Sequence, residues 1–90
     1  MTDMPNPARQ LVADKLRALS PLHLEVHDDS ALHIGHREAA AGAHLRVVVV
    51  AAVFDAMPKI ARHRLVQKTI GDYAAARIHA VQIAAIAPGE

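Results

Sequence analysis

The chain has 90 residues, of which 52% are hydrophobic and 2% aromatic, and its formal net charge at pH 7 is +1. This length suffices for one domain and excludes two, and the scarcity of large rings predicts a small core of modest stability. The lack of cysteine excludes disulfides, and no apolar run approaches the roughly 20 residues of a membrane span. We expect one cytoplasmic domain over residues 1–90, with no membrane contact.

The chain begins with an expected tail and a helix. Residues 1–6 are expected to form a disordered tail. Asn6 and Pro7 then favour a helix start, because Asn caps a helix and Pro suits its first turn. Apolar residues recur at helical spacing as far as Leu19, and the helix is expected to end before Pro21.

Two strands are expected next, joined by a long irregular segment. Residues 22–27 alternate apolar and polar side chains, as a half-buried strand does. The segment from about Asp28 to Ala43 shows no period, and a connection of that length in a small domain is unusual and often functional. A second strand is expected from about His44 to Val53, and its run of four valines predicts burial on both faces at its centre.

The second half of the chain predicts a helix and a third strand. Helical spacing runs over residues 61–73, with Gly71 marking a bend or an early end. Residues 78–84 are rich in β-branched side chains and predict a strand, and residues 85–90 are expected to form a short C-terminal helix or a tail. This order predicts an α+β fold, with a small three-stranded mixed sheet covered by helices on one face.

Seven histidines and no cysteine are the chemical feature that needs an explanation. Histidine is the commonest metal ligand, whereas a thiolate ligand would have to come from a partner. His33 and His36 lie three residues apart in the irregular segment, a spacing that permits two ligands and equally suits two exposed polar residues. His79 lies in the third strand, where a structural role and a ligand role are both open. No His-Glu-x-x-His motif, phosphate loop or nucleophile–base pair is present, so we expect no enzyme.

A cluster of basic residues on the second predicted helix is another candidate site. It has no acidic residue, and its members are Lys59, Arg62, His63, Arg64 and Lys68. Such a cluster is typical of a solvated helix surface. It also fits a contact with DNA or with an acidic partner.

Several short stretches of the chain resemble the BolA-like family, in the family's order and spacing from about Val12 to Pro88. They are Leu24-Glu25-Val26 followed by Asp29-Ser30 with His33, then Ala43-His44-Leu45-Arg46-Val47, Phe54, Arg62-His63-Arg64-Leu65-Val66 and Ile78-His79-Ala80. The chain departs from the family pattern in three places. Ala43-His44-Leu45 replaces Thr-His-Phe, Phe54-Asp55-Ala56 replaces Phe-x-Gly, and Ala51 stands where serine is common.

The resemblance implies a class II KH-like fold of order αββ(α)αβ(α) and a partnership with a monothiol glutaredoxin. In the family the pair shares a 2Fe–2S cluster, whose other ligands are the glutaredoxin cysteine and a glutathione thiolate. The histidine of the Ile-His-Ala motif, here His79, is a cluster ligand in the family. The second ligand comes from the loop between the first two strands, where His33 holds the matching position and His36 is an adjacent candidate.

We therefore expect a non-enzymatic adaptor in iron–sulfur cluster handling or iron homeostasis, which by itself is a monomer or a weak homodimer. The alternative is a DNA-binding transcriptional regulator that uses the basic face of the second predicted helix. The Gly-x-x-Gly signature of KH domains is missing from residues 57–64, and aromatic stacking platforms are missing as well.

Overall fold

The computed structural model of the protein describes residues 7–29 and 43–90. Its helices and strands are α1 (Pro7–Leu16), β1 (His23–Asp28), β2 (Ala43–Val50), α2 (Lys59–Ile70) and β3 (Ile78–Ile86). Two short 3-10 helices follow α1 and β2, at Arg17–Leu19 and Ala52–Phe54. The tail expected at residues 1–6 lies outside the described residues, and so does most of the irregular segment, 30–42.

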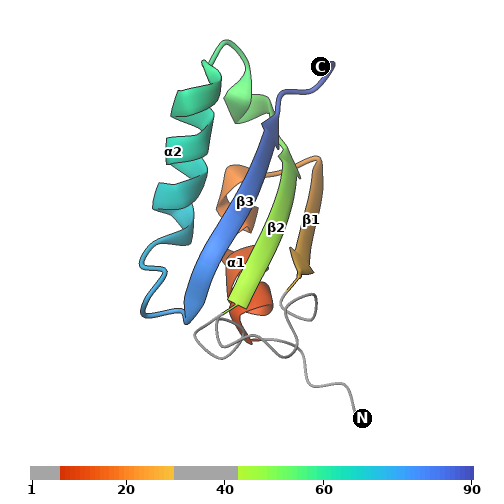
Figure 1. Ribbon diagram of the computed structural model, residues 1–90. Coiled ribbons are helices and arrows are strands. Elements are labelled where there is room, and N and C mark those ends of the chain that lie inside the picture. The colour runs from red at the N-terminus through yellow and green to blue at the C-terminus, as the bar shows by residue number, and fades with distance from the viewer. Residues whose placement is uncertain (1–6, 30–42) are drawn as a thin grey trace.

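The three strands form one mixed sheet in the order β1–β2–β3. The central strand β2 runs antiparallel to β1 and parallel to β3, with Val47 opposite Val26 on one side and Ile83 on the other. Figure 1 shows α1 behind the sheet and α2 running alongside β3. The expected α+β fold, with a three-stranded mixed sheet covered by helices on one face, is confirmed.

Alternation along β2 shows which face of the sheet the helices cover. Buried side chains alternate with partly or fully exposed ones, beginning with buried Ala43 and half-buried His44. Val47 and Val49 are fully buried, whereas Val48 and Val50 are only half-buried. The expected burial of the four valines on both faces is therefore wrong. Successive side chains of a strand point to opposite faces, and only one face of this sheet lies against the helices.

The core lies between this covered face and the two helices. α1 contributes Val12 and Leu16 and α2 contributes Val66 and Ile70, each at most 1% exposed. Phe54 is the largest fully buried side chain and joins this cluster from the 3-10 helix after β2. Fully burying one such side chain stabilises the fold by roughly 1.5–3 kcal/mol.

Two strand boundaries differ from those predicted from the sequence. β2 ends at Val50 rather than near Val53, because the following 3-10 turn directs Phe54 into the core and leaves Val53 45% exposed. β3 continues to Ile86 rather than ending at Ala84, because its parallel pairing with β2 persists to the end of both strands.

The sequence left open two alternatives at the end of α2 and two at the end of the chain, and the structure decides both. α2 ends at Ile70, and Gly71 takes a φ of +90°, a conformation that side chains disfavour. Residues 85–90 form no helix: the first two lie in β3, and Glu90 donates its N–H to the carbonyl of Ala87 in a turn. Within residues 7–29 and 43–90, no helix has the length and hydrophobicity needed to cross a bilayer.

Replacing Phe54 with alanine is expected to lower the free energy of unfolding by about 3–5 kcal/mol, because it leaves a cavity at the centre of the core. The matched control is Val53→Ala, which shortens an exposed neighbour in the same turn and is expected to change stability by roughly 0.5 kcal/mol or less. Urea denaturation followed by far-ultraviolet circular dichroism measures both. Equal losses in the two variants would contradict the central position of Phe54.

Candidate functional site

The face of the sheet away from the helices gathers imidazoles from all three strands. β1 contributes His23, Glu25 and His27 to it, since they pair with the outward-facing positions of β2. β2 contributes His44, and β3 contributes His79. We call this surface the histidine face: His23, Glu25, His27, His44 and His79.

An irregularity in the β2–β3 pairing places His79 on this face. Ala43 pairs with Ile78, but His44 pairs with Ala80, so His79 is an extra residue with no partner in the register. An inserted residue of this kind redirects its side chain, as β-bulges commonly do next to functional sites. His79 is exposed while Ile78 is buried, and the His79 ring centroid lies 4.8 Å from that of His44, with the planes tilted by 40°. The structure thus brings together an exposed imidazole and a half-buried one at one end of the sheet.

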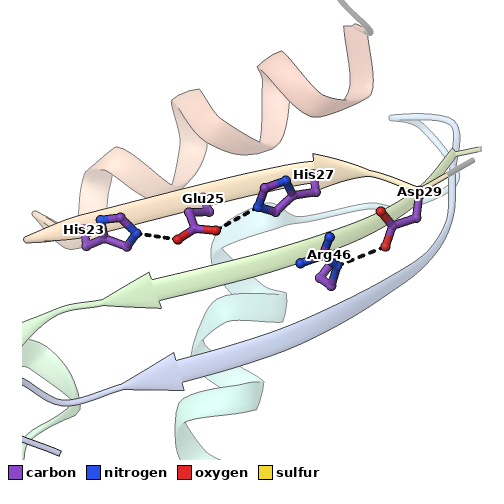
Figure 2. A network of polar contacts seen from close by, with 5 residues as sticks. All are labelled: His23, Glu25, His27, Asp29 and Arg46. Carbon is purple, nitrogen blue, oxygen red and sulfur yellow. Dashed lines mark hydrogen bonds and ion pairs between the residues drawn. The ribbon is translucent and has the colours of Figure 1, made fainter.

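Glu25 links the two other histidines of this face. Its carboxylate accepts hydrogen bonds from Nε2 of His23 at 2.6 Å and from Nε2 of His27 at 2.8 Å. Figure 2 shows the three side chains in a row along β1, with the carboxylate between the two rings. These hydrogen bonds, that from His23 first, lower the pKa of Glu25 from 4.5 to about 2. Because both rings are bonded to Glu25, they are held in place along the edge strand β1.

Asp29 ties the end of β1 to β2. Nε of Arg46 donates to Oδ2 of Asp29 at 3.1 Å, and the backbone N–H of Asp29 donates to the carbonyl of His44 at 2.7 Å. Figure 2 shows the Arg46–Asp29 pair on the same side of the sheet as the histidine row. The chain therefore enters the segment after residue 29 from a position anchored beside His44. His33 and His36, the candidates for a second ligand, lie outside the described residues.

The residues of the basic cluster on α2 do not share one surface in the structure. Lys59, Arg64 and Lys68 are exposed and His63 is half-buried, but Arg62 is only 6% exposed. Arg62, Val66 and Ile70 form one buried stripe at a spacing of four residues. That spacing is the signal in the sequence that would have placed Arg62 on the inner side of α2.

Arg62 joins the start of α2 to the end of the chain. Its Nε donates to the carbonyl of Met57 at 2.9 Å, and its Nη1 donates to the carbonyl of Ala85 at 3.3 Å. Both carboxylate oxygens of Glu90 accept from its guanidinium at 2.6 Å. These hydrogen bonds from Arg62 are the main reason that the pKa of Glu90 falls from 4.5 to about 2. Arg62 thus has a structural role, and the exposed cations of α2 are Lys59, Arg64 and Lys68.

A metal centre held by this chain alone is not present among the described residues. In residues 7–29 and 43–90, no group of three or more His, Cys, Asp or Glu side chains is arranged to hold a metal ion. The sequence did not predict the position of His44 beside His79. Nothing in the sequence marks that contact, because it depends on the extra residue in the β2–β3 pairing.

Replacing both His23 and His27 with alanine is expected to raise the pKa of Glu25 from about 2 toward 4.5, because the carboxylate loses its two donors. A lowered pKa stabilises the folded state above pH 4.5, and that contribution is lost as the pH falls from 4.5 to about 2. Carboxyl ¹³C shifts in a pH titration measure the change, and Glu90 is the internal control because its donor is Arg62. A Glu25 pKa that stays near 2 in the double variant would contradict this network.

Comparison with known proteins gives a consistent result. The profile of the family described as BolA-like protein matches residues 16–90. The chain is 35% identical to mouse BolA-like protein 1 over 85 residues, which cover 93% of this chain and 61% of the mouse protein. It is 32% identical over 76 residues to the DNA-binding transcriptional regulator BolA of Escherichia coli, covering 83% of this chain and 70% of that protein.

Solved structures agree with the sequence comparisons. The solution structure of mouse BolA1 matches with a TM-score of 0.77 at 30% identity, covering 98% of this chain and 71% of that one. BolA1 from Arabidopsis thaliana matches with a TM-score of 0.77 at 27% identity, covering 92% and 94% of the two chains. The chain therefore belongs to the BolA-like protein family.

Proposed function

We propose that the protein is an adaptor that binds a monothiol glutaredoxin and co-ligates a 2Fe–2S cluster with it in iron–sulfur cluster handling or iron homeostasis. The observation that supports this proposal most directly is the position of His79. Its ring is exposed on the open face of the sheet, beside the ring of His44. A buried His79 could not reach a cluster held by another molecule.

The donor set of the chain fits a shared cluster. A 2Fe–2S cluster takes four protein or thiol ligands, and two imidazoles on one iron are an established arrangement. This chain offers imidazoles and has no cysteine, so the thiolates come from the glutaredoxin and from glutathione. His79 is the first ligand in this proposal. His33 is the second, with His36 and the neighbouring His44 as the other candidates.

Imidazole ligation has two consequences for such a centre. Replacing thiolate by neutral imidazole raises the reduction potential of a cluster, as in Rieske centres. Protons compete with iron for the ring nitrogen, so the affinity of the shared cluster falls at low pH. The two properties favour a centre that is easily reduced and readily released.

The decisive variant is His79→Ala, compared with His23→Ala on the opposite edge of the histidine face. Wild-type protein mixed with a glutathione-loaded, cluster-bearing monothiol glutaredoxin is expected to change the visible absorption and circular dichroism of the cluster. His79→Ala is expected to leave the glutaredoxin spectrum unchanged while complex formation, followed by size-exclusion chromatography, persists. His23→Ala is expected to behave as wild type. An unchanged spectrum with wild-type protein, despite a demonstrated complex, would overturn shared ligation.

The same experiment identifies the second ligand. Of the variants His33→Ala, His36→Ala and His44→Ala, the one that reproduces the effect of His79→Ala removes the other imidazole ligand. We expect this to be His33→Ala.

A second candidate function is DNA binding, which the exposed cations of α2 and the name of the Escherichia coli relative favour. Binding through Lys59, Arg64 and Lys68 would release counterions, so its affinity should fall steeply with salt. In fluorescence anisotropy with a duplex, Arg64→Gln is expected to weaken binding and to reduce the salt slope by about 1. Binding that is undetectable at low ionic strength, or insensitive to salt, would reject this function.

A further inference from the structure

The outer edge of β3 presents backbone groups that no strand of the described residues pairs. β3 is the last strand in the sheet order, with β2 on its inner side only. The carbonyl of Ile86 accepts a hydrogen bond from the N–H of Ala51, next to β2, so the even-numbered residues of β3 direct their backbone groups inward. Val81, Ile83 and Ala85 therefore direct theirs outward, because backbone groups alternate sides along a strand.

In the part of the chain that the structure describes, this edge lacks the usual protection against a further strand along most of its length. Edge strands are commonly blocked by charged side chains or proline. No Asp, Glu, Lys, Arg or Pro occurs between Ile78 and Ala87, whereas the opposite edge strand, β1, carries Glu25 and Asp28. Within residues 7–29 and 43–90, the one block lies at the end of β3, where Arg62 donates a hydrogen bond to the carbonyl of Ala85. The part of the edge before that point can accept an added strand.

A groove runs between this edge and α2. It has a volume of about 460 Å³, and its lining comprises Lys59 and His63 of α2, the last four residues of β3, and Glu90. We call it the edge groove. Ile83 gives it an apolar floor, and Glu90 contributes no free charge because both its carboxylate oxygens are bonded to Arg62. Lys59 therefore sets the charge preference of the groove, and His63 adds a polar ring beside it.

We propose that the outer edge of β3 and the edge groove bind an extended acidic peptide segment by strand addition. The backbone groups of Val81 and Ile83 supply hydrogen bonds to such a segment, as in other cases of β-augmentation. Alternate side chains of the added strand lie over Ile83, and its carboxylates lie near Lys59 and His63. This site is separate from the histidine face and does not depend on cluster ligation.

The charges of α2 favour an acidic peptide over a second copy of this chain. Antiparallel pairing of two β3 edges would place two α2 helices side by side. Each of these helices carries Lys59, Arg64 and Lys68 among its cations and has no acidic residue. A single-stranded nucleic acid fits the charge, but binding of that kind relies on aromatic stacking. The single Phe of the chain is buried in the core.

The probe is a synthetic peptide of about six residues, an ordinary strand length, that alternates glutamate with valine. Its titration into ¹⁵N-labelled full-length protein is expected to shift the amides of Val81, Ile83 and Ala85 and to slow their hydrogen exchange. Lys59→Gln is expected to weaken binding about threefold, the effect of losing one exposed ion pair. Lys68→Gln removes an equal charge from the same helix outside the groove, and is expected to bind as wild type does.

Ile83→Pro tests the backbone contact directly. It removes an N–H that faces away from β2, so the pairing within the sheet can persist while the edge loses a donor. Peptide binding is expected to be lost with the spectrum of the rest of the protein retained. His79→Ala is expected to bind the peptide as wild type does, which separates this proposal from the cluster proposal.

Four results would overturn strand addition by an acidic peptide. The first is a peptide with lysine in place of glutamate that binds as tightly, and the second is a set of shifts confined to the histidine face. The third is protection of the same amides by self-association without peptide, which would make a second copy the occupant. The fourth is tighter protection of those amides by an oligothymidylate, which would make the groove a nucleic-acid site.

Discussion

The one-sided burial of β2 is the constraint on which the rest of the structure depends. β2 is the central strand, and only one of its faces lies against the helices. Because side chains alternate, burying Leu45, Val47 and Val49 commits the residues between them to the opposite face. On β1 and β2, this alternation and the strand pairing place the described polar groups that could meet a partner on that face.

Two consequences follow for the histidine face. Along β1 the alternation of side chains puts Glu25 between two imidazoles, which hold its carboxylate in the charged form. Along β3 the regular alternation is broken by one extra residue, and this irregularity turns His79 outward to lie beside His44. The proposed ligand thus stands at the one place where β3 departs from the pleat, which is a common position for a functional side chain.

The burial of Arg62 changes its role from a surface cation to a structural residue. In the sequence it belongs to a run of cations, whereas in the fold it points inward and is bonded to Glu90 and to two backbone carbonyls. A buried guanidinium needs such partners because an unpaired charge is costly to bury. Its hydrogen bonds close the end of β3 and leave Lys59 as the free charge that lines the groove beside α2, next to the imidazole of His63.

The order of helices and strands, the mixed three-stranded sheet and the family resemblance were accessible from the sequence, since periodicity and turn residues are local properties. The partial exposure of Val48 and Val50, the 3-10 turn that sets Phe54 in the core and the end of β3 at Ile86 were not, because they depend on which elements pack together. The family resemblance, through Ile78-His79-Ala80, identified His79 as a candidate ligand. Only the tertiary structure decided that His44 is its neighbour and that Arg62 is bonded to Glu90, because both contacts join residues far apart in the chain.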